Sequence, residues 1–206
     1  MSETNDSALI AALWRVIAAH GWPGLTMGRL AAESGTPLAT LREKFPSRLD
    51  ALILHGRLVD RAVLAGTVPG QGGAARDRLF DVLMRRLDAM QPHRAGILRF
   101  LADMRRDPSL AALLGPQLAL SMRWMLDAAE IGGSAGQRRA LALGLVAVWL
   151  AAVRAWAEDG SEDLGPTMAA LDRALDRAEQ IARTLRLLPA EAADAAPEPG
   201  APAEDA

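Results

Sequence analysis

The chain has 206 residues, of which 50% are hydrophobic and 23% are charged, so it can bury a sizeable core. It contains no cysteine, no tyrosine and only three histidines, which excludes disulfides and leaves few groups for acid–base catalysis or metal binding. We therefore expect a protein that is not an enzyme and that uses neither a cofactor nor a metal. The formal net charge is −2, and the five acids of residues 189–206 leave +3 for the remainder.

The N-terminus is polar and acidic, which is unlike a signal peptide. The longest uncharged apolar run, residues 140–153, is shorter than the roughly 20 residues of a membrane-spanning helix. We expect this run to be a buried helix, and we expect a cytoplasmic protein without stable membrane insertion.

Apolar residues recur at helical spacing and strand patterns are lacking, which predicts an all-α fold of about nine helices. In the first part of the chain, helices are expected at residues 7–19, from Thr26 to near Gly35, from Thr36-Pro37 to near Phe45, and from Ser47 to about Ala65. Longer helices are expected at about 74–90, 93–106, 108–131, 134–158 and 166–187, the third of them bent at Gly115-Pro116.

The glycine-rich segment at residues 66–73 predicts a boundary between two units. Residues 1–65 should form one helical unit and residues 74–188 a larger helical bundle. Residues 189–206 are acidic and rich in alanine and proline, so we expect a disordered tail there.

Residues 26–48 carry the most informative pattern, two short helices joined at Gly35 with a flanking helix on each side. This is the layout of a helix-turn-helix, in which the second helix enters the major groove of DNA. The alternative is a packed helical subdomain that does not contact DNA. The apolar residues spaced to hold the pair against its flanking helices are Leu30, Ala31, Leu41 and Phe45.

At these positions the sequence resembles the TetR family of bacterial repressors, over about residues 8–57. The resemblance implies a TetR-like fold with a helix-turn-helix unit and a bundle whose last two long helices form the dimer interface. It also implies a ligand-responsive repressor of palindromic double-stranded DNA. The matching residues are His20-Gly21-Trp22, Leu25-Thr26-Met27, Leu30-Ala31, Gly35, Thr40-Leu41, Phe45-Pro46-Ser47-Arg48 and Leu52.

The resemblance further implies which residues contact DNA. Arg42 stands where the family usually has an aromatic residue, and its guanidinium would contact the backbone or read a guanine. Glu43 adds a carboxylate to the same helix, and residues 1–55 hold five basic and five acidic residues, an even balance for a DNA-binding unit. The other expected contacts are Thr26 and Thr36 to phosphates, Leu38, Ala39 and Thr40 to base edges, and Lys44 and Arg48 to the backbone.

Parts of the second unit, residues 75–98 and 138–179, resemble the ubiquinone-biosynthesis lipid-binding proteins. Those have a TetR-like fold but bind isoprenoid lipid instead of DNA. This resemblance implies an alternative function, that of a lipid-binding accessory protein without DNA binding. The matching residues are Pro92-His93-Arg94, Asp159, Ser161, Thr167 and Leu171-Asp172-Arg173.

Methionine and aromatic residues are frequent in the middle helices, which suits a pocket for a small apolar ligand such as an isoprenoid or acyl lipid. Ordinary core packing is the alternative. The expected pocket residues are Met90, Phe100, Met104, Met122, Trp124 and Met125.

Trp149 and Trp156 share a helix face in a run that is apolar nearly all round, so one side should be covered by a partner subunit or a ligand. We expect a homodimer, and an entirely intramolecular core is the alternative. The expected interface residues are Trp149, Val153, Trp156, Leu171 and Leu175.

Overall fold

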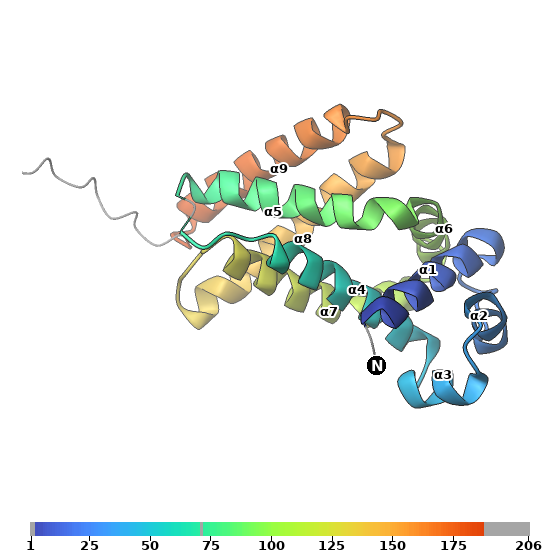
Figure 1. The fold of residues 1–206 in the computed structure, drawn as a ribbon. Helices are drawn as coiled ribbons and strands as arrows, with labels where there is room; N and C mark the ends of the chain where they lie inside the picture. Colours follow the sequence, from blue (N-terminus) through green and yellow to red (C-terminus); the bar gives the residue numbers. More distant parts are fainter. Residues whose placement is uncertain (1–2, 71, 188–206) are drawn as a thin grey trace, which may run out of the picture.

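The computed structural model describes residues 3–70 and 72–187 (Figure 1). These residues form α-helices and one short 3-10 turn and include no strand, which confirms the expected all-α fold. The expected disordered tail, residues 189–206, lies outside the described residues. The helices are α1 (Glu3–His20), α2 (Met27–Ser34), α3 (Leu38–Lys44), α4 (Arg48–Ala65), α5 (Ala75–Met90), α6 (Arg94–Met104), α7 (Pro108–Ala128), α8 (Ala135–Glu158) and α9 (Gly165–Thr184), with the turn η1 (Gln91–His93) before α6.

Local capping groups set the ends of the short helices. The Thr26 hydroxyl oxygen accepts a hydrogen bond from the Arg29 amide at 3.2 Å at the start of α2. Gly35 follows the last turn of α2 with a φ of 65°, a conformation that costs glycine little. Ser47 and Asp50 form a capping box before α4, in which the Ser47 amide donates to Asp50 at 2.7 Å. These ends agree with the signals in the sequence.

The start of α3 differs from the prediction. The sequence predicted that this helix starts at Thr36-Pro37, with the threonine as its cap, as in helices that carry proline in the first turn, but α3 begins at Leu38. Pro37 is itself the capping residue and has an extended backbone, with φ −57° and ψ 143°. The Thr36 amide donates to the Ser34 hydroxyl at 3.2 Å, so Thr36 belongs to the turn between α2 and α3.

The α2–α3 pair forms one end of the molecule, with the bundle helices α5, α8 and α9 extending away from it (Figure 1). Close contacts join this end to the bundle through α1 and α6. The Trp22 amide donates to the Asp103 carboxylate at 2.8 Å. Gly96 of α6 lies against the backbone of Trp14 in α1, where there is no room for a side chain. The predicted boundary at residues 66–73 coincides with the α4–α5 connection, but the hydrophobic core is continuous across it.

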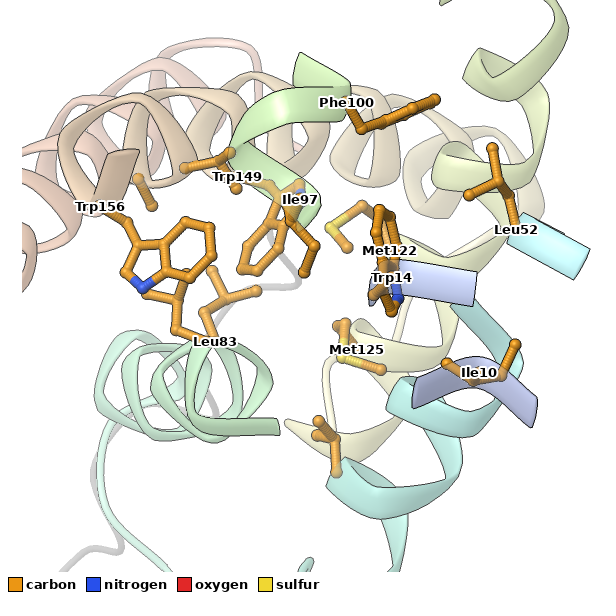
Figure 2. Packing of buried hydrophobic residues seen from close by; sticks show 14 of the residues in the cluster. Ile10, Trp14, Leu52, Leu83, Ile97, Phe100, Met122, Met125, Trp149 and Trp156 are labelled. Carbon is orange, nitrogen blue, oxygen red and sulfur yellow. The ribbon is translucent and has the colours of Figure 1, made fainter. Parts of the chain in front are cut away.

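At the centre of the bundle, aromatic side chains and two methionines, Met122 and Met125, pack within the hydrophobic core (Figure 2). α8 packs against α7 and α9, and its inner side buries Trp149 and Trp156. The Trp156 indole N–H donates to the Gln91 side-chain oxygen at 3.0 Å. By length and composition, α8 is the one described helix that could cross a membrane, and 39% of its most apolar window is buried inside the protein. Its buried side agrees with the core helix expected from residues 140–153.

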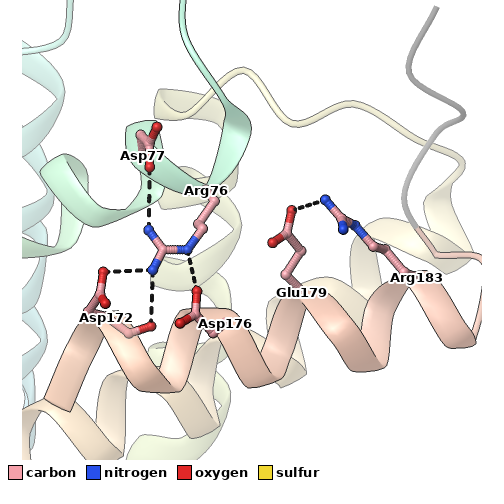
Figure 3. Close-up of polar contacts among 6 residues, drawn as sticks. All are labelled: Arg76, Asp77, Asp172, Asp176, Glu179 and Arg183. Atoms are coloured by element: carbon pink, nitrogen blue, oxygen red, sulfur yellow. Dashed lines mark hydrogen bonds and ion pairs between the residues drawn. The ribbon is translucent and has the colours of Figure 1, made fainter. Parts of the chain in front are cut away.

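Arg76, near the start of α5, links α5 to α9 (Figure 3). Its guanidinium donates to the carboxylates of Asp172 and Asp176, both at 2.6 Å. These two acids are one turn apart on α9, so a single planar guanidinium reaches both. The hydrogen bonds raise the pKa of Arg76 above its usual value.

Candidate DNA-binding and ligand-binding sites

α3 is anchored by one side and exposes the other at the end of the molecule. Leu41 and Phe45 are buried against the neighbouring helices. Ala39 lies on the opposite side, since an α-helix turns about 100° per residue. The three residues expected to contact base edges and Arg42 all lie on this one short helix, with Leu38, Ala39 and Arg42 exposed and Thr40 partly buried.

The two threonines expected to contact phosphates flank α2. Thr26 is exposed, and because its hydroxyl oxygen accepts the capping bond, its O–H remains free to donate. Thr36 is partly buried in the turn before α3, and its amide is already bonded to Ser34. Thr26 is thus better placed than Thr36 for a phosphate contact.

The two basic residues expected to contact the DNA backbone already interact with other residues of the same chain. Lys44 forms an ion pair with Asp6 of α1. The Arg48 guanidinium lies 4.5 Å from the centre of the Trp22 ring and donates to the carbonyl of that residue at 3.1 Å. Arg42 is more accessible, with one hydrogen bond of 3.4 Å to a backbone carbonyl. Lys44 and Arg48 would have to exchange these contacts to reach a phosphate.

Glu43 is exposed on α3, one turn after Ala39. It therefore lies on the same outward side as the expected reading residues. A carboxylate at this place repels phosphates but can accept a hydrogen bond from cytosine.

A cavity of about 570 Å³ lies among α1, α4, α5, α6, α7 and α8. Its volume falls within the range of small-molecule sites, roughly 300–1,000 Å³. Met122 and Met125 do not line it, because each lies one residue beyond a lining residue of α7 and is turned about 100° into the core. Four of the six expected pocket residues line the cavity, namely Met90, Phe100, Met104 and Trp124.

One part of the cavity wall is polar. Arg86, which is 5% exposed, forms an ion pair with Asp60. The Ser121 hydroxyl donates to the same carboxylate oxygen at 2.6 Å. The Arg86 guanidinium also lies 5.0 Å from the centre of the Trp149 ring. These contacts hold a cation at the wall of a mostly apolar cavity.

His55 is a further titratable group at this wall. Burial, together with smaller electrostatic contributions from His93 and Arg86, lowers its pKa to about 3. The imidazole is therefore neutral at physiological pH. No group of three or more histidine, aspartate or glutamate side chains within residues 3–70 and 72–187 could hold a metal ion.

Our reading of the sequence did not identify this polar group. Arg86 occupies a position on the buried stripe of α5, four residues after Val82 and three after Leu83. A charged residue on an apolar stripe is a signal that could have been used. Its pairing with Asp60 and Ser121 could not be predicted from the sequence, since these residues are far apart in the chain.

The expected dimer contacts lie inside the chain and not on its surface. All five are buried, with exposures from 0% to 7%, so a partner subunit cannot reach them. Trp149 and Val153 instead line the cavity. The reason is that Trp149 lies against Arg86 of α5, while Trp156 contacts Gln91 of η1 and Arg94 of α6, which favours the intramolecular alternative for these residues. The expected contacts found in the core are Trp149, Val153, Trp156, Leu171 and Leu175.

The outer side of α8 is apolar and uncovered in the single chain. Leu143 is 57% exposed, and Leu150, at the edge of the cavity, is 52% exposed. The small residues between them on this outer side are also exposed. This outer face of α8 consists of Leu143, Gly144, Ala147, Leu150 and Ala151.

Four of the residues that carry the second resemblance, Arg94, Asp159, Ser161 and Thr167, hold the α8–α9 turn. The Asp159 carboxylate accepts hydrogen bonds from Ser161 and Thr167, including 2.6 Å from the Thr167 hydroxyl, and these bonds lower the pKa of Asp159. Arg94 donates to the carbonyls of Trp156 and Asp159 at 2.8 and 2.6 Å. These side chains do not line the cavity. Their hydrogen bonds stabilise the turn instead.

Comparison with solved structures identifies this architecture as the TetR-family fold. A TetR transcriptional regulator from Nitrosomonas europaea aligns with a TM-score of 0.67 and 17% identity, over 85% of this chain and 98% of that chain. A TetR regulator from Rhodococcus sp. RHA1 aligns with a TM-score of 0.59 and 16% identity, over 84% and 94%. One from Streptomyces coelicolor aligns with a TM-score of 0.57 and 15% identity, over 89% and 82%. No protein-family model and no curated protein sequence matches this chain.

Proposed function

We propose that this protein is a ligand-responsive DNA-binding transcriptional regulator of the TetR type, a repressor that acts in the cytoplasm on palindromic double-stranded DNA. The observation that carries the proposal is the exposed side of α3. Leu38, Ala39 and Arg42 are accessible at the free end of the molecule, while Leu41 and Phe45 anchor the helix from behind. The fold, shared with solved transcriptional regulators, supports it.

The proposed regulator is a homodimer that forms through the outer face of α8. This face combines exposed leucines with Gly144, Ala147 and Ala151, whose small size lets a second helix approach closely. A two-fold axis there would pair the same surface on both subunits. Palindromic DNA then requires two α3 helices about one DNA turn apart, roughly 34 Å.

α4 can couple ligand binding in the cavity to the position of α3, the helix proposed to read DNA. It begins at Arg48, beside the reading helix, and its later turns line the cavity with Leu52, His55 and Asp60. A ligand that packs against α4 can favour a conformer in which the two reading helices no longer match the DNA spacing. Release of DNA then follows from the difference in ligand affinity between the two conformers.

The test is selection of sheared genomic DNA by the purified protein at about 0.15 M salt, where non-specific binding is largely screened. We expect one palindromic site to be enriched, and we expect Thr40→Ala and Arg42→Ala to weaken its binding without unfolding the protein. Arg123→Ala removes an exposed arginine of α7 outside the reading unit and serves as the matched control. Unchanged affinity in both α3 variants would remove these residues as readers.

The second candidate is a lipid-binding accessory protein that retains the fold without binding DNA. Two observations favour it, the largely apolar cavity and the engagement of Lys44 and Arg48 within the chain. Folded, dimeric protein that enriches no DNA site but co-purifies with an isoprenoid or acyl lipid would select this candidate. An empty cavity that also takes up no added quinone would count against it.

A further inference from the structure

Two enclosed side-chain nitrogens in the described part of the chain have no hydrogen-bond partner, Trp14 Nε1 and Arg86 Nε. Both belong to residues that line the cavity, and these residues, Trp14 and Arg86, are only 4% and 5% exposed. A buried donor without an acceptor costs free energy that a ligand can recover. The cavity therefore has a shortage of hydrogen-bond acceptors and not of donors.

The geometry of Arg86 specifies the shape of the missing acceptor. Its Nη1 is used, since it pairs with Asp60 and lies 3.9 Å from the Met125 sulfur. No described residue accepts a hydrogen bond from Nε, and the hydrogen bonds that the guanidinium makes come from Nη1. Nε and Nη2 together form the other edge of the guanidinium. Two parallel N–H donors on one edge match the two oxygens of a carboxylate.

The charge of the lining agrees with a single negative charge on the ligand. The charged residues of the lining are Arg57, Asp60 and Arg86, with a net charge of +1. His55 adds no charge at neutral pH, because burial keeps its imidazole neutral. Arg86 and Asp60 already form a pair, and the remaining positive charge, on Arg57, is exposed, so a monoanion would bring the lining as a whole to neutrality.

The remaining lining determines what the rest of the ligand is. Arg86 is deeply buried, whereas Leu120, Trp124 and Leu150 at the edge of the cavity are 49–52% exposed. Between them the lining is formed mainly by leucine, methionine and aromatic side chains. A ligand with its charged group at Arg86 would extend an apolar body toward these three residues.

We infer that the effector of this protein is an apolar monocarboxylic acid, whose carboxylate binds the Nε–Nη2 edge of Arg86 and whose body fills the cavity. The word effector rests on the proposed regulatory function, but the ligand class does not. The Trp14 indole N–H is the second donor available at the same wall. Asp60 and Ser121 act as positioning residues that hold Arg86 in place.

The experiment compares decanoate with decan-1-ol by isothermal titration, with no DNA present. The two probes share chain length and differ in the carboxylate. We expect decanoate to bind at least about tenfold more tightly, as two charge-assisted hydrogen bonds allow. Arg86→Lys keeps the charge beside Asp60 but loses the two-donor edge, so this preference should largely disappear. Arg94→Lys, an arginine outside the cavity, should retain it.

Equal affinity for the two probes in the wild-type protein would overturn the inference, and so would a preference that survives in folded Arg86→Lys. If Arg86→Lys does not fold, the wild-type comparison still decides. A separate titration of decanoate against the protein–DNA complex tests its role as effector. Decanoate binding without any DNA binding would contradict the proposed function alone, and DNA binding without acid preference would contradict this inference alone.

Discussion

At the level of single residues, the neutral histidine in the cavity wall has a measurable consequence. The His55 ring contacts the Trp14 ring edge-on, with centroids 4.9 Å apart, and the His93 ring lies 5.8 Å away. The pKa of His55 is about 3 in the folded chain, against 6.5 when unperturbed. Between these values the unfolded chain binds a proton that the folded chain does not. His55 therefore favours unfolding progressively as the pH falls from 6.5 toward 3.

We predict that His55→Gln reduces the dependence of thermal stability on pH. The wild-type protein should lose about 2 kcal/mol more than the variant between pH 7 and pH 5, since only its unfolded state gains this proton. The measurement is the melting temperature of both proteins across that range. His20→Gln, which changes an exposed histidine at the end of α1, is the control. Parallel curves for wild type and His55→Gln would contradict the prediction.

At the level of elements, α1 and α6 approach each other closely at Gly96. A Cβ atom added at Gly96 would overlap the Trp14 carbonyl oxygen and lie 3.0 Å from the Trp14 ring. A backbone neighbour cannot rotate away as a flexible side chain can. The absence of a side chain at Gly96 therefore helps to set the position of the helix-turn-helix unit on the bundle.

We predict that Gly96→Ala destabilises the protein by about 1–3 kcal/mol, the cost of overpacking a tight contact. Gly136→Ala in α8 is the matched control, because a Cβ atom there meets nothing within 4 Å. It should be neutral or slightly stabilising, since alanine favours the helix. Chemical denaturation of the two variants provides the measurement. Equal stabilities would show that α1 and α6 can separate at little cost.

Several features of these elements follow from short-range signals in the sequence. Thr26 and Gly35 delimit α2, and Ser47 with Asp50 starts α4, because capping bonds join residues at most a few positions apart. The error at Thr36 has the same local scale. The cap is Pro37 and not the adjacent Thr36, whose amide donates a hydrogen bond to the Ser34 hydroxyl.

At the level of the whole molecule, assembly should depend on the outer face of α8. We predict that Ala147→Glu gives a folded monomer that no longer binds palindromic DNA tightly. A charge at the centre of an apolar contact would have to be buried without a partner. Leu113→Glu, at an exposed apolar position of α7, should remain dimeric. Light scattering after size-exclusion chromatography distinguishes the two results, and a dimeric Ala147→Glu protein would contradict the proposed interface.

The sequence by itself determined the all-α class, most helix boundaries and the place of the helix-turn-helix, because periodicity and capping act over a few residues. Only the tertiary structure decided the roles of the apolar side chains. α8 is apolar nearly all round, so periodicity could not tell that Trp149 and Trp156 face the core while Leu143 faces outward. Likewise, only packing joined Arg86 to Asp60 and Ser121 at the cavity wall, since the groups that satisfy a buried charge come from separate helices.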